Sequence, residues 1–183
     1  MSERVFEGAA SVRQLPQRGM ITLRGDLSSA ALQAAATDIS TGAFPERGHC
    51  DSMGARGIAW MSPDEALVMC PHDVVGTSVA SLKSALAGTH HLVQDVSDAR
   101  VIFAIEGDAA RDVVAKLCPV DMRPAQFGPG RFRRTRLAQI PCAFWMRGDG
   151  GIELVVFSSV ADYAWSVLSN AARADAAVGH FAP

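Results

Sequence analysis

The densest group of side chains able to do binding chemistry is a run of arginines at residues 131–136, RFRRTR. Guanidinium groups bind carboxylates and phosphates through paired hydrogen bonds, and arginine is enriched in protein interfaces. The run also fits a solvated edge strand, whose charges block unwanted pairing. Both interpretations stay open, with phosphate or RNA binding as a weaker third. The candidate partner-contact residues are Phe127, Arg131, Phe132, Arg133, Arg134 and Arg136.

The groups that commonly catalyse reactions show no comparable pattern. Most Asp and Glu residues stand at expected turns and helix starts, where capping and solvation explain them. His90 and His91 would point to opposite sides of a strand. The sequence has no His-x-x-x-His, Cys-x-x-Cys or Gly-x-Ser-x-Gly pattern. We therefore expect no catalytic residue and no metal ligand on this chain.

The glycine-rich segments also carry no cofactor signature. Residues 128–130 (GPG) and the Gly54 and Gly57 pair are too short for a dinucleotide fingerprint or a phosphate-binding loop. They also lack the strand-to-helix setting that such loops need, so we interpret them as turns. A site for FAD or NAD within this chain is not expected.

The clearest elements lie just before the arginine run. An apolar, β-branched run at residues 102–106 predicts a strand, which Gly107 ends. Asp108 is expected to cap a helix, and Pro119 follows the end of that helix. The buried helix face is predicted from the spacing of Ala110, Val113, Val114 and Leu117.

A similar pattern occurs earlier in the chain and indicates an internal repeat. Residues 21–35 align with residues 103–117 as an apolar strand, Gly-Asp and a helix, and residues 58–69 align with residues 143–156 as a hairpin. This alignment places two large anchors at equivalent positions, Trp60 and Trp145. Each half is predicted to run strand, helix, strand, strand, helix, with extra strands at residues 89–96 and 131–139.

This order favours an α+β fold built from two pseudo-symmetric, split βαβ-like halves. Residues 1–18 are interpreted as an N-terminal arm, and residues 19–183 as a single domain whose repeats span about 19–88 and 100–172. The longest loops, residues 40–57 and 119–130, follow the first helix of each half. Long loops are often functional, so both are candidate contact surfaces.

The totals are ordinary for a globular chain of 183 residues, with 49% hydrophobic and 20% charged residues. A net charge of −2 gives no attraction to nucleic acid or an anionic membrane. The charged N-terminal residues do not resemble a secretory signal, and no apolar run is long enough to cross a bilayer. We expect a cytoplasmic protein whose four widely spaced cysteines stay reduced.

Several segments together resemble one known family. Residues 95–100, 107–121, 134–141 and 158–165 are similar to the gamma subunit of heterotetrameric sarcosine oxidase, and the resemblance covers roughly residues 19–172. It implies a fold like the folate-binding domain of the glycine-cleavage T-protein, which agrees with the duplicated α+β pattern. It also implies a cofactor-free subunit without catalytic residues.

The resemblance further implies the partners and the reaction of the whole complex. The alpha and beta subunits are expected to carry FAD, FMN, NAD and folate, and the delta subunit to bind zinc. The complex would demethylate sarcosine oxidatively to glycine, yielding hydrogen peroxide and formaldehyde or methylene-tetrahydrofolate. The isolated chain is expected to self-associate. The alternative function is a stand-alone folate-binding or one-carbon-transfer protein of the T-protein type.

Overall fold

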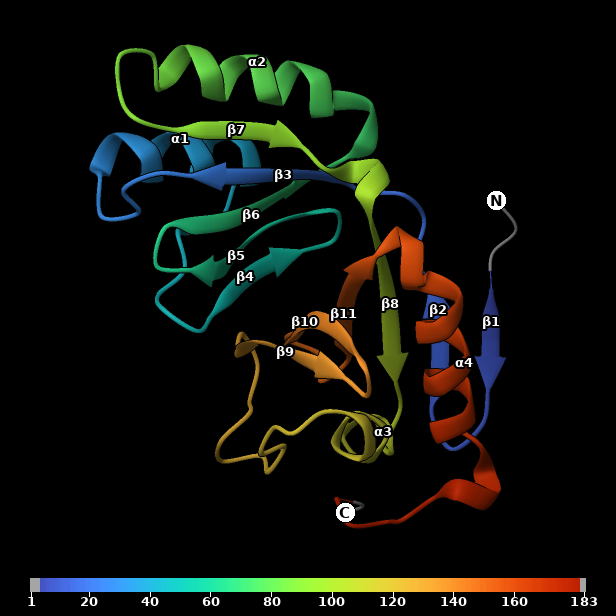
Figure 1. The fold of residues 1–183 in the computed structure, drawn as a ribbon. Helices are drawn as coiled ribbons and strands as arrows, with labels where there is room; N and C mark the ends of the chain where they lie inside the picture. Colours follow the sequence, from blue (N-terminus) through green and yellow to red (C-terminus); the bar gives the residue numbers. More distant parts are fainter. Residues whose placement is uncertain (1–3, 182–183) are drawn as a thin grey trace. The chain divides into compact units, whose positions relative to one another are not determined.

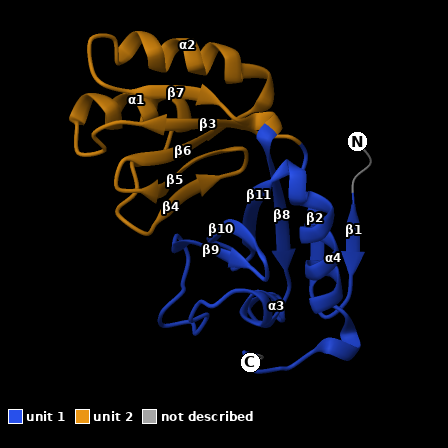
Figure 2. Ribbon diagram, viewed as in Figure 1, with its two compact units in different colours: residues 1–16, 99–183 blue, residues 17–98 orange. Residues whose placement is uncertain are grey.

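The structure, a computed structural model, describes residues 4–181, which form two compact units (Figures 1 and 2). Unit 2 comprises Gln17–Asp98, and unit 1 comprises the described parts of Met1–Pro16 and Ala99–Pro183. In each unit an antiparallel sheet carries two helices that pack against it and against each other. The predicted mixed α+β fold is therefore confirmed. No helix in residues 4–181 combines the length and apolar character needed to span a bilayer.

Unit 2 contains a five-stranded sheet in the order β4-β5-β6-β3-β7. Its apolar core lies between the sheet and the two helices, as the alternating inward residues of the strands require. The predicted loop at residues 40–57 is shorter than expected, because part of it forms β4. The elements are β3 (Gly19–Arg24), α1 (Ala30–Ser40), β4 (Cys50–Met53), β5 (Arg56–Ser62), β6 (Glu65–Cys70), α2 (Val75–Ala85) and β7 (Leu92–Asp95).

Unit 1 contains a six-stranded sheet in the order β1-β2-β8-β11-β10-β9. Its core again lies between sheet and helices, and it includes the predicted helix face of residues 110–117. The elements are β1 (Val5–Glu7), β2 (Ser11–Gln14), β8 (Arg100–Glu106), α3 (Ala110–Leu117), β9 (Phe132–Leu137), β10 (Ile140–Met146), β11 (Ile152–Phe157) and α4 (Ala161–Ala171).

The two units repeat the same connection of strands. The sheet neighbours β4-β5-β6-β3 of unit 2 correspond to β9-β10-β11-β8 of unit 1. In chain order, a helix follows the first strand of each set (β3 or β8) and another follows the last (β6 or β11). In unit 2, β7 pairs with the outer side of β3. In unit 1, the equivalent position beside β8 is occupied by β2, which comes from the N-terminal part of the chain. The second repeat is therefore completed by a strand that precedes the first.

The prediction of an N-terminal arm is wrong for its described part. Residues 5–14 form a hairpin whose second strand pairs with β8 from Ser11 to Gln14. Val12 is fully buried in the core of unit 1. At the turn, a Cβ on Gly8 would lie 2.2 Å from the carbonyl oxygen of Ala172, so only glycine allows this approach. Periodicity missed the hairpin because so few of its residues face the core.

The predicted helix cap at Asp108 is also wrong. Asp108 does not cap α3, whose N-cap position is held by Ala109 without a side-chain hydrogen bond. Helix α4 likewise starts without a side-chain cap, because residues 158–160 make a 3-10 turn and Val160 stands at the N-cap position. Short polar side chains before a helix occur in tight turns as well as at caps, and the residues before these helices form turns.

The sheet registers correct the expected equivalence of Trp60 and Trp145. Counted outward from β3 and β8, Ile58 of unit 2 and Phe144 of unit 1 occupy the same place in their sheets. Trp60 therefore corresponds to Met146, and both side chains pack on the helix side. Trp145 faces the opposite way, because a shift of one residue in a strand reverses every side chain.

Candidate functional site

The arginine run forms β9, the terminal strand in the sheet order of unit 1. The strand is buried at its two ends, at Phe132 and Leu137. Between them, Arg134 and Arg136 are exposed and Arg133 is half-buried. This alternation confirms the edge-strand interpretation, in which charged side chains protect the rim of a sheet. It also leaves arginine side chains available at the surface of the unit.

The two aromatic candidates lie inside the unit. Phe127 and Phe132 are 0% and 1% exposed, so neither ring reaches a partner from the surface of this chain. The ring centroids of Phe127 and Phe144 lie 5.0 Å apart. Phe127 therefore fixes the loop of residues 119–130 to the sheet through apolar packing. Contact with a partner is left to the polar residues around these rings.

Arg111 anchors the same loop from the other side, a role that the sequence reasoning missed. Its guanidinium donates hydrogen bonds to the carbonyl oxygens of Met122 (2.7 Å) and Phe127 (2.8 Å) and to the sulfur of Met146 (3.1 Å). Burial lowers the pKa of Arg111. The one available signal was a charged residue within the first turn of an otherwise apolar helix face.

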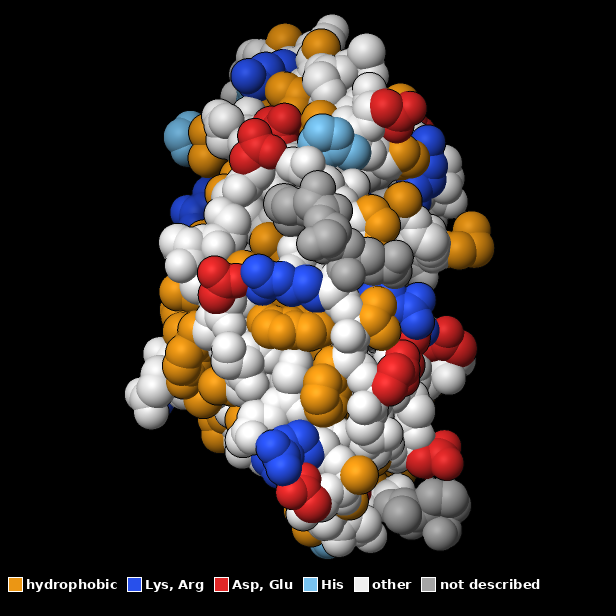
Figure 3. Space-filling model, turned by 90° about the vertical axis from the view of Figure 1, so that its right-hand side faces the viewer, with side chains coloured by type: hydrophobic (Ala, Val, Ile, Leu, Met, Phe, Trp, Pro, Cys, Tyr) orange, Lys and Arg blue, Asp and Glu red, His pale blue; other side chains and the backbone are white. Residues whose placement is uncertain are grey.

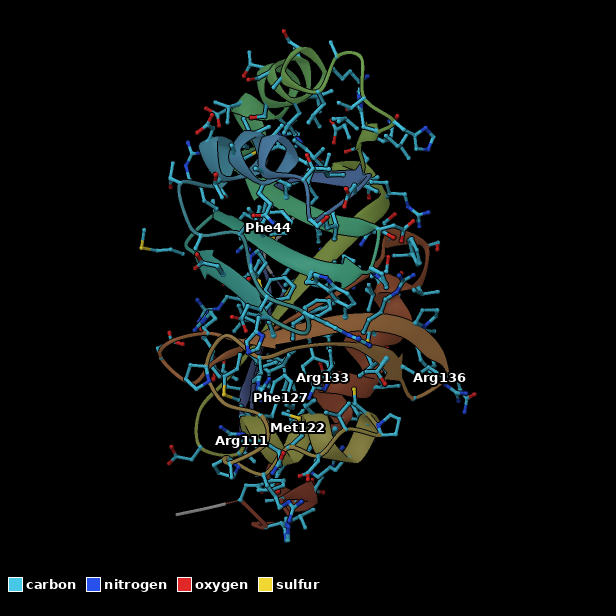
Figure 4. All side chains as sticks on the ribbon, turned by 90° about the vertical axis from the view of Figure 1, so that its left-hand side faces the viewer. Phe44, Arg111, Met122, Phe127, Arg133 and Arg136 are labelled. Atoms are coloured by element: carbon cyan, nitrogen blue, oxygen red, sulfur yellow. The ribbon has the colours of Figure 1, made fainter. Side chains whose placement is uncertain are left out.

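Figure 4 shows how these residues lie within unit 1. Arg111, Met122, Phe127 and Arg133 gather around the loop, whereas Arg136 points away at the end of its strand. The Arg133 guanidinium lies 5.8 Å from the centroid of the Phe127 ring, and it donates a hydrogen bond to the carbonyl oxygen of Phe132. The arginines of β9 therefore do not converge on one point.

A cavity of about 340 Å³ lies between the loop and β9. Asp121 on its rim is held by Arg123, whose Nε and Nη2 both reach the carboxylate. The hydrogen bonds from Arg123 lower the pKa of Asp121 to about 2. Since that negative charge is already paired with Arg123, the guanidinium of Arg133 gives the lining a positive charge. The lining residues are Pro119, Val120, Asp121, Gln126, Arg133, Arg134 and Thr135.

A second cavity, of about 470 Å³, lies beside the β8–α3 turn and the β10–β11 hairpin. Arg147 is its central charge and pairs with Asp149 and Glu106. Burial lowers the pKa of Arg147, but the hydrogen bonds with Asp149 and Glu106 outweigh that effect and raise it. Because these charges neutralise one another, this cavity offers a weaker attraction to an ion than the cavity at β9.

A third cavity, of about 420 Å³, lies between α3 and α4. Lys116 on its wall donates hydrogen bonds to the carbonyl oxygens of Ala171 (2.8 Å) and Ala176 (2.5 Å). Its ammonium group therefore closes the C-terminal end of α4, as a cation near a helix C-terminus does. This arrangement has a structural explanation and needs no ligand.

The remaining surface and the titratable groups give no rival site in the described part of the chain. Among residues 4–181, no three His, Cys, Asp or Glu side chains are grouped so that they could hold a metal ion. On the face in Figure 3, acidic, basic and apolar side chains are interspersed. That face therefore has no field of a single sign, and the positive cavity at β9 remains the best candidate.

Comparisons with known proteins agree over most of the chain. A family model described as the sarcosine oxidase, gamma subunit family matches residues 24–174. The sarcosine oxidase subunit gamma of Arthrobacter sp is 33% identical over 152 residues, which cover 81% of this chain and 73% of that protein. The same subunit of Corynebacterium sp. (strain U-96) is 33% identical over 146 residues, which cover 78% and 69%.

Solved structures give the same picture. A chain of the heterotetrameric sarcosine oxidase from Corynebacterium sp. U-96 matches with a TM-score of 0.81 and 25% identity, covering 92% of this chain and 86% of that one. The glycine cleavage system aminomethyltransferase T from Bartonella henselae matches with a TM-score of 0.64 and 14% identity, covering 89% of this chain and 46% of that one. The second match shows the shared fold alone.

Proposed function

Since the chain belongs to the sarcosine oxidase gamma subunit family, we propose that it works as the non-catalytic gamma subunit of a heterotetrameric sarcosine oxidase. The complex would demethylate sarcosine oxidatively to glycine, with hydrogen peroxide and formaldehyde or methylene-tetrahydrofolate as products. The observation that carries the proposal is the fold match to a chain of a heterotetrameric enzyme over 92% of this chain. A match of that extent leaves little of the chain outside the shared architecture.

The chemistry of the complex is assigned to the other subunits. We assign FAD, FMN, NAD and folate to the alpha and beta subunits and zinc to the delta subunit, with none on this chain. A cytoplasmic location fits the four cysteines, which are all buried and form no disulfide in the described part of the chain. The contribution of this chain would then be structural, as a surface that holds the flavin-bearing subunits together.

The docking surface we propose is the β9 edge with the loop of residues 119–130. Arg131, Arg133, Arg134 and Arg136 supply its positive charge, while the buried rings of Phe127 and Phe132 hold the loop and strand in shape. Interfaces of permanent complexes typically bury more than about 2,000 Å² in total. The β9 edge would therefore be one part of a larger contact, and the isolated chain is expected to self-associate through the remainder.

Co-expression tests the proposal. The tagged chain is produced with the flavin-bearing subunits of its own host, and the purified material is examined for stoichiometry, flavin absorbance and sarcosine-dependent peroxide formation. We expect a complex with one copy of this chain, and no flavin or oxidase activity in the chain alone. A yellow and active isolated chain, or flavin-bearing subunits that assemble fully without it, would contradict the proposal.

The alternative function, a stand-alone folate-binding or one-carbon-transfer protein, rests on the fold it shares with the aminomethyltransferase. Fold by itself does not fix function, because unrelated activities recur on one scaffold. Titration of the isolated chain with tetrahydrofolate separates the two. Saturable binding at micromolar concentration would favour the alternative, and no binding would favour the subunit role.

A further inference from the structure

We propose that the 340 Å³ cavity between β9 and the loop of residues 119–130 receives a carboxylate side chain from the partner subunit that docks on β9. The inference rests on the proposed function and deepens it, because it names the chemistry of one contact. The partner segment would be extended and acidic, and would run along the rim of the sheet with one Asp or Glu side chain entering the cavity.

The cavity lining carries a positive charge. Its one acidic residue, Asp121, is already paired with Arg123, while Arg133 also lines the wall. Arg133 forms no ion pair with any carboxylate of residues 4–181, and its hydrogen bond goes to the neutral carbonyl oxygen of Phe132. A guanidinium has five N–H donors, so most of its capacity remains for an incoming group. The ligand that suits this cavity is an anion.

Arg133 is held in place by an aromatic ring. Its planar group lies over the Phe127 ring at 5.8 Å from the ring centroid, and the ring itself is fully buried. Stacking on an aromatic face holds the guanidinium in a fixed plane, from which a carboxylate can accept two parallel hydrogen bonds. The donor group is therefore oriented before any partner arrives, which reduces the entropy lost on binding.

The opposite wall of the cavity, formed by the loop of residues 119–130, is also held in place. Arg111 fixes the loop through the carbonyl oxygens of Met122 and Phe127. Asp121 accepts a hydrogen bond from the backbone N–H of Arg123 (3.0 Å) as well as from its side chain. Both walls of the cavity are thus formed by residues of unit 1, independently of a partner.

The repeat places opposite charges at equivalent positions. Arg133, opposite Phe144 in β10, corresponds to Asp51, opposite Ile58 in β5. Asp51 accepts a hydrogen bond from the backbone N–H of Ala43 (2.6 Å) in the loop of its own unit. Arg133 also contacts its own loop, at Phe127, but a guanidinium has only donors, so its remaining N–H groups suit an anion that comes from outside the unit.

The location favours a protein segment over a free small anion. The cavity opens beside the terminal strand of a sheet, where the rim of the strand can accept an extended backbone alongside it. Its lining also includes the apolar side chains of Pro119 and Val120, which suit the stem of a carboxylate side chain more than a bare inorganic anion. We therefore commit to an acidic segment of the partner.

The test measures association of the purified chain with the flavin-bearing subunits prepared without it. Arg133→Gln removes the charge in the cavity, and Arg173→Gln is the matched control, because Arg173 is an exposed arginine paired with Asp175 and lies outside both β9 and the loop of residues 119–130. We expect the Arg173→Gln Kd to stay within about twofold of the native value. We expect Arg133→Gln to raise the Kd about tenfold or more. Gln126→Glu, which keeps Arg133 but places a carboxylate in the cavity, should also raise the Kd.

Circular dichroism and thermal unfolding of each variant show whether the fold is intact, and Gln126→Glu keeps the test valid if Arg133→Gln does not fold. Equal Kd values for the Arg133 and Arg173 variants, with normal assembly, would overturn this inference and leave the proposed function standing. Failure of the unmodified chain to assemble would remove the proposed function itself. Saturable binding of inorganic phosphate to the free chain, dependent on Arg133 and without competition with assembly, would assign the cavity to a small anion instead.

Discussion

Replacing Arg111 with methionine tests whether a buried guanidinium holds the loop of residues 119–130 in place. Methionine keeps a flexible apolar side chain but removes every N–H donor. The carbonyl oxygens of Met122 and Phe127, bonded at 2.7 and 2.8 Å, then lose their partner. Both residues are almost completely buried, so water reaches these oxygens poorly.

The expected loss follows from the two carbonyls. A buried acceptor left without a partner costs about 1–3 kcal/mol, which gives about 2–6 kcal/mol for the pair. The variant also no longer buries a charge, since burial disfavours the charged form of Arg111 and lowers its pKa. This gain offsets part of the loss, and we expect the free energy of unfolding of unit 1 to fall by about 2 kcal/mol.

Hydrogen exchange read by mass spectrometry locates the effect. The backbone N–H of Phe127, which donates to the carbonyl oxygen of Arg123 (2.9 Å), should exchange faster in Arg111→Met, and the urea midpoint should fall. Arg123→Met is the control, because its ion pair with Asp121 is exposed and solvent-exposed pairs contribute little to stability. If Arg111→Met matches the native chain, or the control, in both measurements, Arg111 does not anchor the loop.

Three further predictions use other groups. The pKa of Asp121 should read about 2 by NMR titration and rise toward the ordinary range in Arg123→Gln, which removes the guanidinium but keeps the backbone N–H donor. The stabilising effect of Asp121 is present above the ordinary Asp pKa and is lost as pH falls toward 2. A hydrogen bond with Cys118 and burial raise the pKa of the Cys142 thiol. The thiol should therefore resist Ellman's reagent in the native state. Its contribution to stability should decline as pH rises above the ordinary thiol pKa, because the unfolded chain then loses the proton first. Gly107→Ala should lower the free energy of unfolding by about 1–2 kcal/mol, seen as a lower urea midpoint, because φ is +99° at this position.

The elements with strong local patterns were predictable from the sequence. The apolar run before Gly107 is β8, and the helical spacing behind it is α3. The hairpin around residues 62–65 also forms as its Ser-Pro-Asp-Glu turn indicates, with Ser62 opposite Glu65. In these segments each side chain's environment repeats with the period of the backbone, so neighbouring residues are sufficient to identify the element.

The elements that failed depend on partners far away in the chain. Strands β1 and β2 carry few core residues, and their hairpin is fixed by pairing with β8 and by the contact of Gly8 with Ala172. The register of β5 and β10 decides which face each tryptophan takes, and similar residue types cannot reveal a shift of one position. A single misplaced residue in an alignment is therefore enough to misassign a face.

The candidate site divides in the same way. Its arginines and its loop were visible as a charge cluster and as a long irregular segment, and a place at a sheet edge was one of two interpretations that the charges left open. The terminal position of β9 in the sheet came from the structure. The burial of Phe127 and the anchoring by Arg111 were not visible, because both depend on contacts across the core of unit 1.

By itself, the sequence determined the fold class, the repeated order of elements and the positive charge of the β9 strand, because period, turn chemistry and charge are properties of neighbouring residues. Only the tertiary structure decided that the N-terminal residues complete the second sheet, that two candidate aromatics are core residues, and that Arg133 faces a cavity. Each of these outcomes depends on strand register and on which distant side chains share a core. Those are set by the packing of the whole unit and by no single segment of it.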